Sequence, residues 1–114
     1  MFLSSHEPCS MCLSAITFAG FDNFYYLFPY ADTNSEFNIP HDLNILKEVF
    51  KINDGDYNKE NYYWKSQNIN SLIDNLPPSE KEKVLNLLYE IKKKYLTLSN
   101  QYQKNKDGNS IPLN

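Results

Sequence analysis

Residues 1–20, MFLSSHEPCSMCLSAITFAG, decide the fold that the sequence predicts. The first five residues form a short apolar run, which is typical of a β-strand. Pro8 suits the first turn of a helix, because its missing N–H group would have no partner there in any case. Residues 9–19 are apolar on most sides, and Gly20 is a residue that ends helices well. The stretch predicts a strand followed by a helix, and a helix that is apolar all round is expected to be buried.

Further elements follow along the chain. The aromatic run 23–28 predicts a second strand, and residues 29–40 are rich in turn-forming residues and are expected to be a loop. Apolar residues at helical spacing predict an amphipathic helix over residues 40–50. The sequence Asn-Asp-Gly-Asp at 53–56 predicts a turn, and residues 68–75 are expected to form a short helix that ends before two prolines.

The clearest helix begins after those prolines. Ser79 and Glu82 match the S-x-x-E capping box, in which each side chain caps a backbone N–H group of the first turn. Apolar residues then repeat at intervals of four and three, which gives one apolar stripe. The stripe consists of Val84, Leu88, Ile91, Tyr95 and Leu98. Residues 104–114 are polar and are expected to be a flexible tail.

Charge and composition restrict the partners of the chain. Its 114 residues include 11 Lys, no Arg and 14 acidic residues, a net charge of −3, and fit one small domain or part of one. Residues 1–46 hold five acids and no Lys, so nucleic acid is not an expected partner. The longest uncharged stretch, residues 8–21, is shorter than the roughly 20 residues needed to cross a bilayer. We therefore expect a cytoplasmic protein with no membrane contact.

Cys9 and Cys12 are the residues with the clearest potential for chemistry. They lie three positions apart at the predicted start of a helix, so their side chains face the same way. A helix N-terminus favours anions, so both thiols are expected to ionise more easily there. Two thiolates on one face supply half of a tetrahedral zinc site. The motif alone also fits two other readings: buried structural cysteines or a redox dithiol.

The residues around this motif resemble a known family. The matching segments are Glu7-Pro8-Cys9-Ser10-Met11-Cys12, Ala15-Ile16, Gly20-Phe21 and the strand 23–27. They are similar to the zinc-dependent cytidine/deoxycytidylate deaminases, a family that includes nucleoside, guanine and tRNA-adenosine deaminases and carries H-x-E followed by P-C-x-x-C. The resemblance is strong over residues 3–28 and continues toward residue 50.

The resemblance implies an α/β fold, part of the three-layer cytidine-deaminase-like architecture, with a helical C-terminal extension. Together with the apolar stripe of the last long helix and the polar composition of the tail, which lie beyond the resemblance, this divides the chain into three expected parts. These are the C-terminal part of a deaminase domain (1–66), a helical extension (67–103) and the tail (104–114).

The resemblance further implies hydrolytic deamination of a nucleobase, nucleoside or nucleotide, with zinc as the cofactor. Cys9 and Cys12 match two zinc ligands of the family. The third ligand, a His or Cys from an upstream helix, and the proton-transferring Glu two residues after it have no counterpart, because the chain contains no H-x-E. We therefore expect a chain that is inactive alone and that depends on a missing N-terminal segment or on a partner copy. Within this chain, His6 is a candidate for the missing zinc ligand, and Glu7 is a candidate for the missing proton-transferring group. Both are weaker candidates than Cys9 and Cys12 are as zinc ligands.

Candidate residues of the substrate pocket are His6, Glu7, Phe28 and Tyr30, because they lie at or beyond the ends of the two predicted strands. Two other functions stay open. One is a non-catalytic interaction protein on a deaminase-like remnant, which would use the aromatic segment 57–64 and the last long helix. The other is a redox or structural zinc module that uses only the two cysteines.

Overall fold

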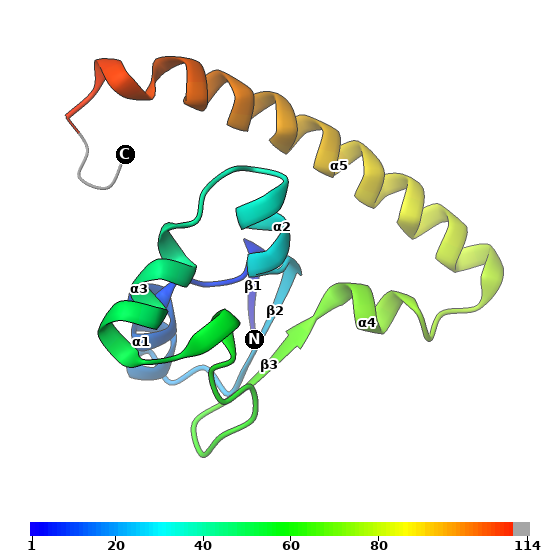
Figure 1. The fold of residues 1–114 in the computed structure, drawn as a ribbon. Helices are drawn as coiled ribbons and strands as arrows, with labels where there is room; N and C mark the ends of the chain where they lie inside the picture. The colour runs from blue at the N-terminus through cyan, green and yellow to red at the C-terminus, as the bar shows by residue number, and fades with distance from the viewer. Residues whose placement is uncertain (111–114) are drawn as a thin grey trace.

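The computed structural model describes residues 1–110, which form a mixed α/β chain (Figure 1). The strands are β1 (Phe2–His6), β2 (Asn23–Phe28) and β3 (Lys65–Asn68). The helices are α1 (Ser10–Phe18), α2 (Tyr30–Ser35), α3 (His41–Phe50), α4 (Ile69–Ile73) and α5 (Pro78–Asn105). Two short 3-10 turns are η1 (Asn53–Gly55) and η2 (Lys106–Gly108). The predicted α/β class is therefore confirmed, as are both predicted strands.

The three strands form one parallel sheet in the order β1-β2-β3. Ser4 of β1 pairs with Tyr26 of β2, and Tyr26 pairs with Asn68 of β3. Every second side chain of the central strand is buried, which gives β2 one fully covered face. All three strands end at the same edge of the sheet, so the segments that follow them meet there.

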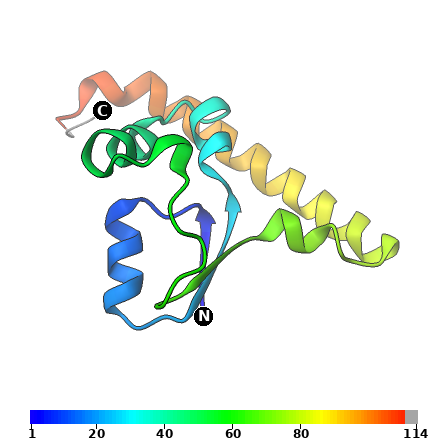
Figure 2. The same cartoon turned by 60° about the horizontal axis from the view of Figure 1, so that its bottom comes forward.

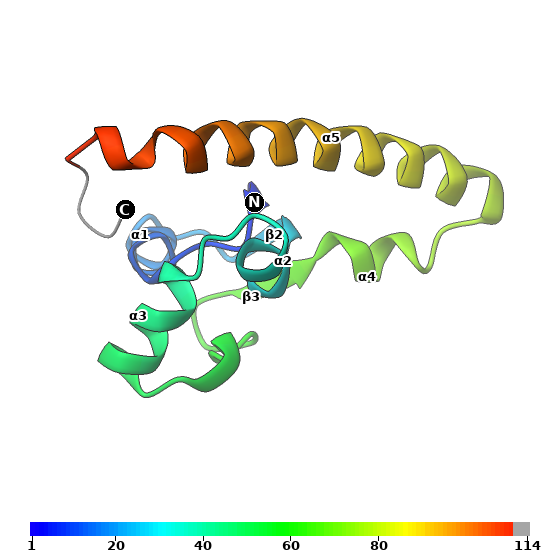
Figure 3. The same cartoon turned by 45° about the horizontal axis from the view of Figure 1, so that its top comes forward.

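Helices lie on both sides of this sheet. On one side, Ile16 of α1 and Leu46 of α3 join the buried cluster built around Phe24 and Tyr26 of β2. On the other side, the long helix α5 runs across the sheet, as Figures 2 and 3 show. Residues of α5 line an apolar groove together with Leu27 of β2. The sheet is thus the middle layer, and its aromatic face forms the main core.

Helix α1 ends as the sequence predicts but is not buried. Gly20 has a positive φ of 75°, its N–H group donates to the carbonyl of Thr17, and the N–H group of Phe21 donates to the carbonyl of Ile16. The expected burial on all sides is wrong, because only Ile16 is buried and the side chain of Phe18 is 93% exposed. The helix packs on the sheet with one face, and within residues 1–110 no element covers the opposite face.

Two elements differ from the sequence predictions. The expected loop 29–40 contains α2, in which Tyr30 and Thr33 are buried, so tertiary packing outweighs the turn-rich composition. Strand β3 was not predicted, because its sequence, KSQN, is polar and shows no apolar alternation. The predicted helices at 40–50 and 68–75 are confirmed as α3 and α4, and the predicted turn at 53–56 forms η1.

The start of α5 also differs from the prediction. The helix begins at Pro78, with Pro77 as its N-cap residue and no side-chain capping bond, so the capping box of Ser79 and Glu82 is wrong. Pro78 already occupies the first helical position, which shifts Ser79 inside the helix. The helix extends into the expected tail as far as Asn105, and the last four residues of that tail, 111–114, lie outside the described residues.

Polar contacts hold the C-terminal half of α5 to the segment after α2. Lys92 forms an ion pair of 2.6 Å with Glu36. The hydroxyl of Ser99 donates to the carbonyl of Phe37 at 2.6 Å, and the amide of Gln103 donates to the carbonyl of Asn38 at 3.0 Å. None of the side chains of α5 is fully buried, so these contacts add to its aromatic packing through Tyr95.

The central strand should dominate stability. Phe24 is 0% exposed, so we expect Phe24→Ala to lower the free energy of unfolding by about 3–5 kcal/mol. The control is Phe18→Ala on the exposed face of α1, which removes the same atoms and should cost less than about 0.5 kcal/mol. Urea unfolding followed by circular dichroism measures both, and equal losses would show that the aromatic face of the sheet is not the core.

Candidate functional site

Cys9 and Cys12 lie together at the start of α1. Cys9 is the N-cap residue, with extended backbone geometry (φ −66°, ψ 170°), and Cys12 follows one turn later. Their Sγ atoms are 3.5 Å apart, and both thiols are free and half-buried. Two zinc–sulfur bonds of about 2.3 Å at a tetrahedral angle would hold the sulfurs about 3.8 Å apart. The pair therefore fits two of the four positions around a zinc ion.

The thiol of Cys12 is harder to ionise than expected. Burial raises the pKa of Cys12, and its hydrogen bond with Cys9 raises it further. The prediction that the helix N-terminus makes both thiols easier to ionise is therefore wrong for Cys12 when no metal is bound. A metal ion bound between the two sulfurs would instead lower the pKa of Cys12, because its positive charge favours the thiolate.

The structure does not place a third ligand beside the two thiols. Within residues 1–110, no group of three or more His, Cys, Asp or Glu side chains is arranged to hold a metal ion. The ring of His6 packs instead against Phe28, Phe37 and Tyr95, with ring centroids 4.8–5.2 Å away. Burial lowers the pKa of His6. The hypothesis that His6 completes the zinc site therefore has no support in the geometry.

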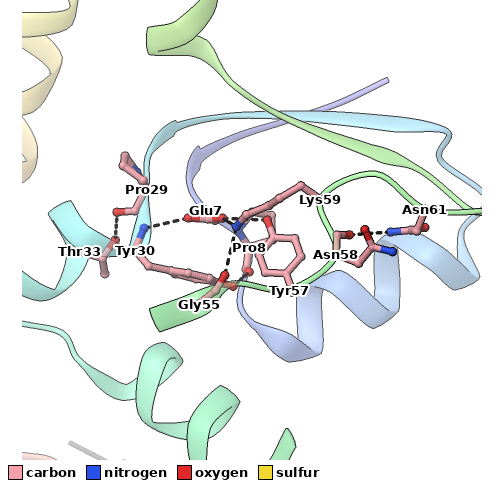
Figure 4. Close-up of polar contacts among 10 residues, drawn as sticks. All are labelled: Glu7, Pro8, Pro29, Tyr30, Thr33, Gly55, Tyr57, Asn58, Lys59 and Asn61. Carbon is pink, nitrogen blue, oxygen red and sulfur yellow. Dashed lines mark hydrogen bonds and ion pairs between the residues drawn. The ribbon is translucent and has the colours of Figure 1, made fainter. Parts of the chain in front are cut away.

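Glu7 is the most constrained charged residue of the chain. Its side chain is 3% exposed and lies between the ends of β1 and β2 (Figure 4). Oε2 accepts a hydrogen bond from the backbone N–H group of Tyr30 at 2.9 Å. Oε1 accepts from the hydroxyl of Tyr57 at 2.8 Å and from the ammonium of Lys59 at 2.7 Å. Both oxygens are thus engaged by the protein, which argues against Glu7 as a free base.

Two further contacts lock the turn between β1 and α1. The N–H group of Glu7 donates to the carbonyl of Phe28 at 2.8 Å, which extends the pairing of β1 with β2. The hydroxyl of Tyr30 donates to the carbonyl of Pro8, the residue directly before Cys9. The position of Cys9 is therefore set by groups from β2 and α2 as well as by its own helix.

Gly55 lets the Tyr30 ring approach the loop after α3. Its φ is +66°, and a β-carbon at this position would collide with the ring of Tyr30. Besides its bond to Glu7, the ammonium of Lys59 donates a hydrogen bond to the carbonyl of Gly55 at 3.2 Å. The loop thereby presents Lys59 both to Glu7 and to the ring of Tyr57, whose centroid is 3.6 Å from Nζ.

The candidate residues from the sequence fall into three neighbouring groups. Cys9 and Cys12 form the thiol pair. Glu7 and Tyr30 belong to the buried hydrogen-bond network. His6 and Phe28 pack in an aromatic cluster beneath α5. All of these residues lie near the end of the sheet where β1 and β2 finish, but the three groups have different neighbours.

Sequence reasoning missed Tyr57 and Lys59. Within the aromatic segment 57–64, Tyr57 and Trp64 are buried, whereas Tyr62 and Tyr63 are exposed. The indole N–H group of Trp64 donates to the hydroxyl of Thr17 at 2.8 Å and so ties this segment to α1. No sequence pattern singled out Lys59, because its partner Glu7 lies 52 positions away.

The comparisons with known proteins add no relative: no family model, no curated protein and no solved structure matches the chain. Over the described part of the chain, none of the helices has the length and apolar character needed to cross a membrane. Any assignment of function therefore depends on the residues and contacts described above.

The ion pair of Lys59 with Glu7 should contribute measurably to stability. Lys59→Met leaves the buried carboxylate of Glu7 without its cationic partner, so we expect the free energy of unfolding to fall by about 1–3 kcal/mol. The control, Lys65→Met, removes an exposed ion pair with Glu60 and should cost less than about 1 kcal/mol. If urea unfolding gives the same loss for both variants, the buried pair contributes no more than the surface pair.

The tyrosines around Glu7 predict loss of stability in alkali. Burial, followed by the nearby Glu7 carboxylate, raises the pKa of Tyr26 to about 12 and raises the pKa values of Tyr30 and Tyr57 as well. Because these pKa values exceed 10.0, that of a free tyrosine, the protonated side chains favour the folded state below pH 10. This contribution is lost as the pH rises toward 12.

Tyrosinate absorbance measured together with circular dichroism tests this. We expect these tyrosines to ionise only as the chain unfolds, and Tyr57→Phe to reduce the loss of stability with pH. Ionisation of every tyrosine near pH 10 in a chain that stays folded would disprove it.

Proposed function

We propose that the chain is the C-terminal part of a zinc-dependent deaminase of nucleobases, nucleosides or nucleotides, and that it is inactive alone. The observation that carries the proposal is the placement of the thiol pair. A parallel strand leads through Glu7 and Pro8 into a helix whose first turn holds two sulfur atoms 3.5 Å apart. In open parallel sheets, ligands bind beyond the carboxyl ends of the strands, and the pair lies at that edge.

The architecture supports the same proposal. The order strand, helix, parallel strand agrees with the segments that resemble the deaminase family, and helices lie on both sides of the sheet. We therefore propose the three-layer cytidine-deaminase-like fold for this chain, with α5 as its C-terminal extension. The lack of Arg and the acidic character of residues 1–46 favour a small-molecule substrate over a polynucleotide.

The chemistry divides between this chain and a second segment. In hydrolytic deamination, water adds to the ring carbon that bears the amine, and ammonia leaves; a bound zinc ion supplies the activation of that water. Cys9 and Cys12 would hold the ion from one side. The remaining ligand and the proton-transferring Glu must come from a segment with H-x-E, which the sequence does not contain. Without that Glu, roughly 10²–10⁴ in rate is lost.

A redox dithiol is the second candidate, because a sulfur–sulfur distance of 3.5 Å also suits formation of a disulfide. Catalysis of insulin reduction by the chain, together with a failure to bind zinc, would favour this candidate over the deaminase.

Zinc binding by the isolated chain should be weak and should depend on both thiols. Two thiolates without a third protein ligand leave half of the tetrahedron to water. We expect zinc to be removed by mild chelation, and Cys9→Ser or Cys12→Ser to abolish binding measured by calorimetry. A tightly held zinc ion that survives Cys9→Ser would mean that the assigned ligands are wrong.

Deaminase activity should appear only when the missing residues are supplied. The lone chain should release no ammonia from cytosine, cytidine, guanine or adenine derivatives. Fusion in frame to a strand–helix segment with H-x-E, taken from a deaminase of this family, should produce activity, and Cys12→Ala should remove it. Turnover by the lone chain that Cys12→Ala abolishes would refute the proposal, because residues of this chain would then supply the missing groups.

A further inference from the structure

The thiol pair is close to the geometry of a disulfide as well as to that of a metal site. Cys9 and Cys12 are the only cysteines of the sequence, and both are free and half-buried. Their Sγ atoms are 3.5 Å apart, whereas the sulfurs of a disulfide are about 2.05 Å apart. The two sulfurs must therefore approach by about 1.5 Å to form the bond. Zinc requires the opposite movement, because it holds two sulfurs about 3.8 Å apart.

The backbone around the pair is held on both sides, so the approach of the sulfurs falls to the side chains. Before the pair, the N–H group of Glu7 donates to the carbonyl of Phe28 at 2.8 Å. The carbonyl of Cys9 accepts the first hydrogen bond of α1, from the N–H group of Leu13 at 2.8 Å. Rotation of the two cysteine side chains about their Cα–Cβ bonds closes the remaining distance and leaves α1 in place.

We propose that Cys9 and Cys12 form a redox switch, in which a small disulfide such as glutathione disulfide converts the two thiols into an intramolecular disulfide and thereby removes the metal site. A small thiol restores the site by reducing the bond. This inference rests on the proposed function, because the state that is switched off is the metal-binding pair. It differs from redox catalysis, since the chain is the target of thiol–disulfide exchange and not its catalyst.

The exchange takes place in two steps. One protein thiolate attacks a sulfur of glutathione disulfide, so that a mixed disulfide forms and the first glutathione leaves as a thiolate. The second protein thiolate attacks the protein sulfur of the mixed disulfide, which forms the bond between Cys9 and Cys12 and releases the second glutathione. In total, the two protein thiols lose two electrons and two protons, and glutathione disulfide is reduced to two molecules of glutathione.

Metal binding and disulfide formation exclude each other at this pair. The thiolate is the form of cysteine that binds metals, so the disulfide removes both ligands that the chain offers. A bound metal ion conversely occupies the sulfur electron pairs that would attack the oxidant. The two effects are reciprocal, so a metal ion that is lost on oxidation must also protect the thiols from oxidation. Both cysteines are half-buried, and partly exposed disulfides are the ones that small thiols reduce readily.

Cadmium titration of the chain in three states tests the switch: reduced, oxidised with glutathione disulfide, and reduced again with dithiothreitol, each after removal of the reagent. Thiolate–metal absorbance should appear in the first and third states and be absent from the second. Mass spectrometry should show the oxidised chain lighter by two hydrogen atoms and without bound glutathione. Cadmium added before the oxidant should slow formation of the disulfide about tenfold or more. Circular dichroism should be the same in all three states, because the bond lies within one helix turn.

Single substitutions distinguish the disulfide from other oxidation. Cys12→Ser leaves one thiol, so oxidation should stop at the mixed disulfide with glutathione. The control is Ser14→Ala, which removes an exposed hydroxyl of α1 and should form the intramolecular disulfide as the wild-type chain does.

The outcomes separate the two proposals. A reduced chain that binds no cadmium overturns the metal site, and the switch with it. A reduced chain that binds cadmium overturns the switch alone if oxidation leaves both thiols free or stops at bound glutathione. The switch also fails alone if the oxidised chain contains the disulfide and binds cadmium equally well.

Discussion

The buried carboxylate of Glu7 is the interaction on which the end of the sheet depends. A carboxylate removed from water is strongly unfavourable unless hydrogen bonds and an opposite charge replace the lost hydration. Here the replacements come from Tyr30, Tyr57 and Lys59, which lie 23, 50 and 52 positions further along the chain. One side chain from the end of β1 thus holds the start of α2 and the loop after α3 in place.

The thiol pair benefits directly from this arrangement. Glu7 and Pro8 precede Cys9, and both are held by contacts outside α1, to the carbonyl of Phe28 and the hydroxyl of Tyr30. The first turn of α1 therefore begins at a fixed place, even though much of the helix is exposed to solvent. Pre-positioned ligands lose less conformational entropy when a metal binds, which matters most for a site with only two thiols. The network thus links the fold of the chain to the proposed chemistry.

Much of the local structure could be predicted because it depends on neighbouring residues. The strand 23–28 follows from its aromatic run, and the helix that ends at Gly20 follows from the positive φ that glycine adopts there. The polar strand β3 could not be predicted, because it is held by pairing with β2 and not by its own sequence pattern. The open face of α1 was missed for a related reason, since apolar composition does not show whether a second surface exists to cover it.

The candidate site was predicted only in part. The spacing of Cys9 and Cys12 was sufficient to bring their sulfur atoms together, because both lie on one helix turn. The surroundings of Glu7 were not readable, since they combine segments about 50 residues apart that share no pattern. The environment of His6 could not be predicted for the same reason. Its aromatic neighbours Phe37 and Tyr95 come from the segment after α2 and from α5.

The affinity of the thiol pair for cadmium, followed by thiolate–metal absorbance, tests most directly whether Glu7 positions the pair. Glu7→Gln keeps the shape of the side chain but cannot accept from all the same donors. The matched control is Glu60→Gln, which removes an exposed ion pair. In conditions where all three proteins are folded, we expect Glu7→Gln to bind cadmium about tenfold more weakly than the wild-type chain and Glu60→Gln to bind equally well. Equal affinity in all three proteins would show that the thiol pair is positioned by α1 alone.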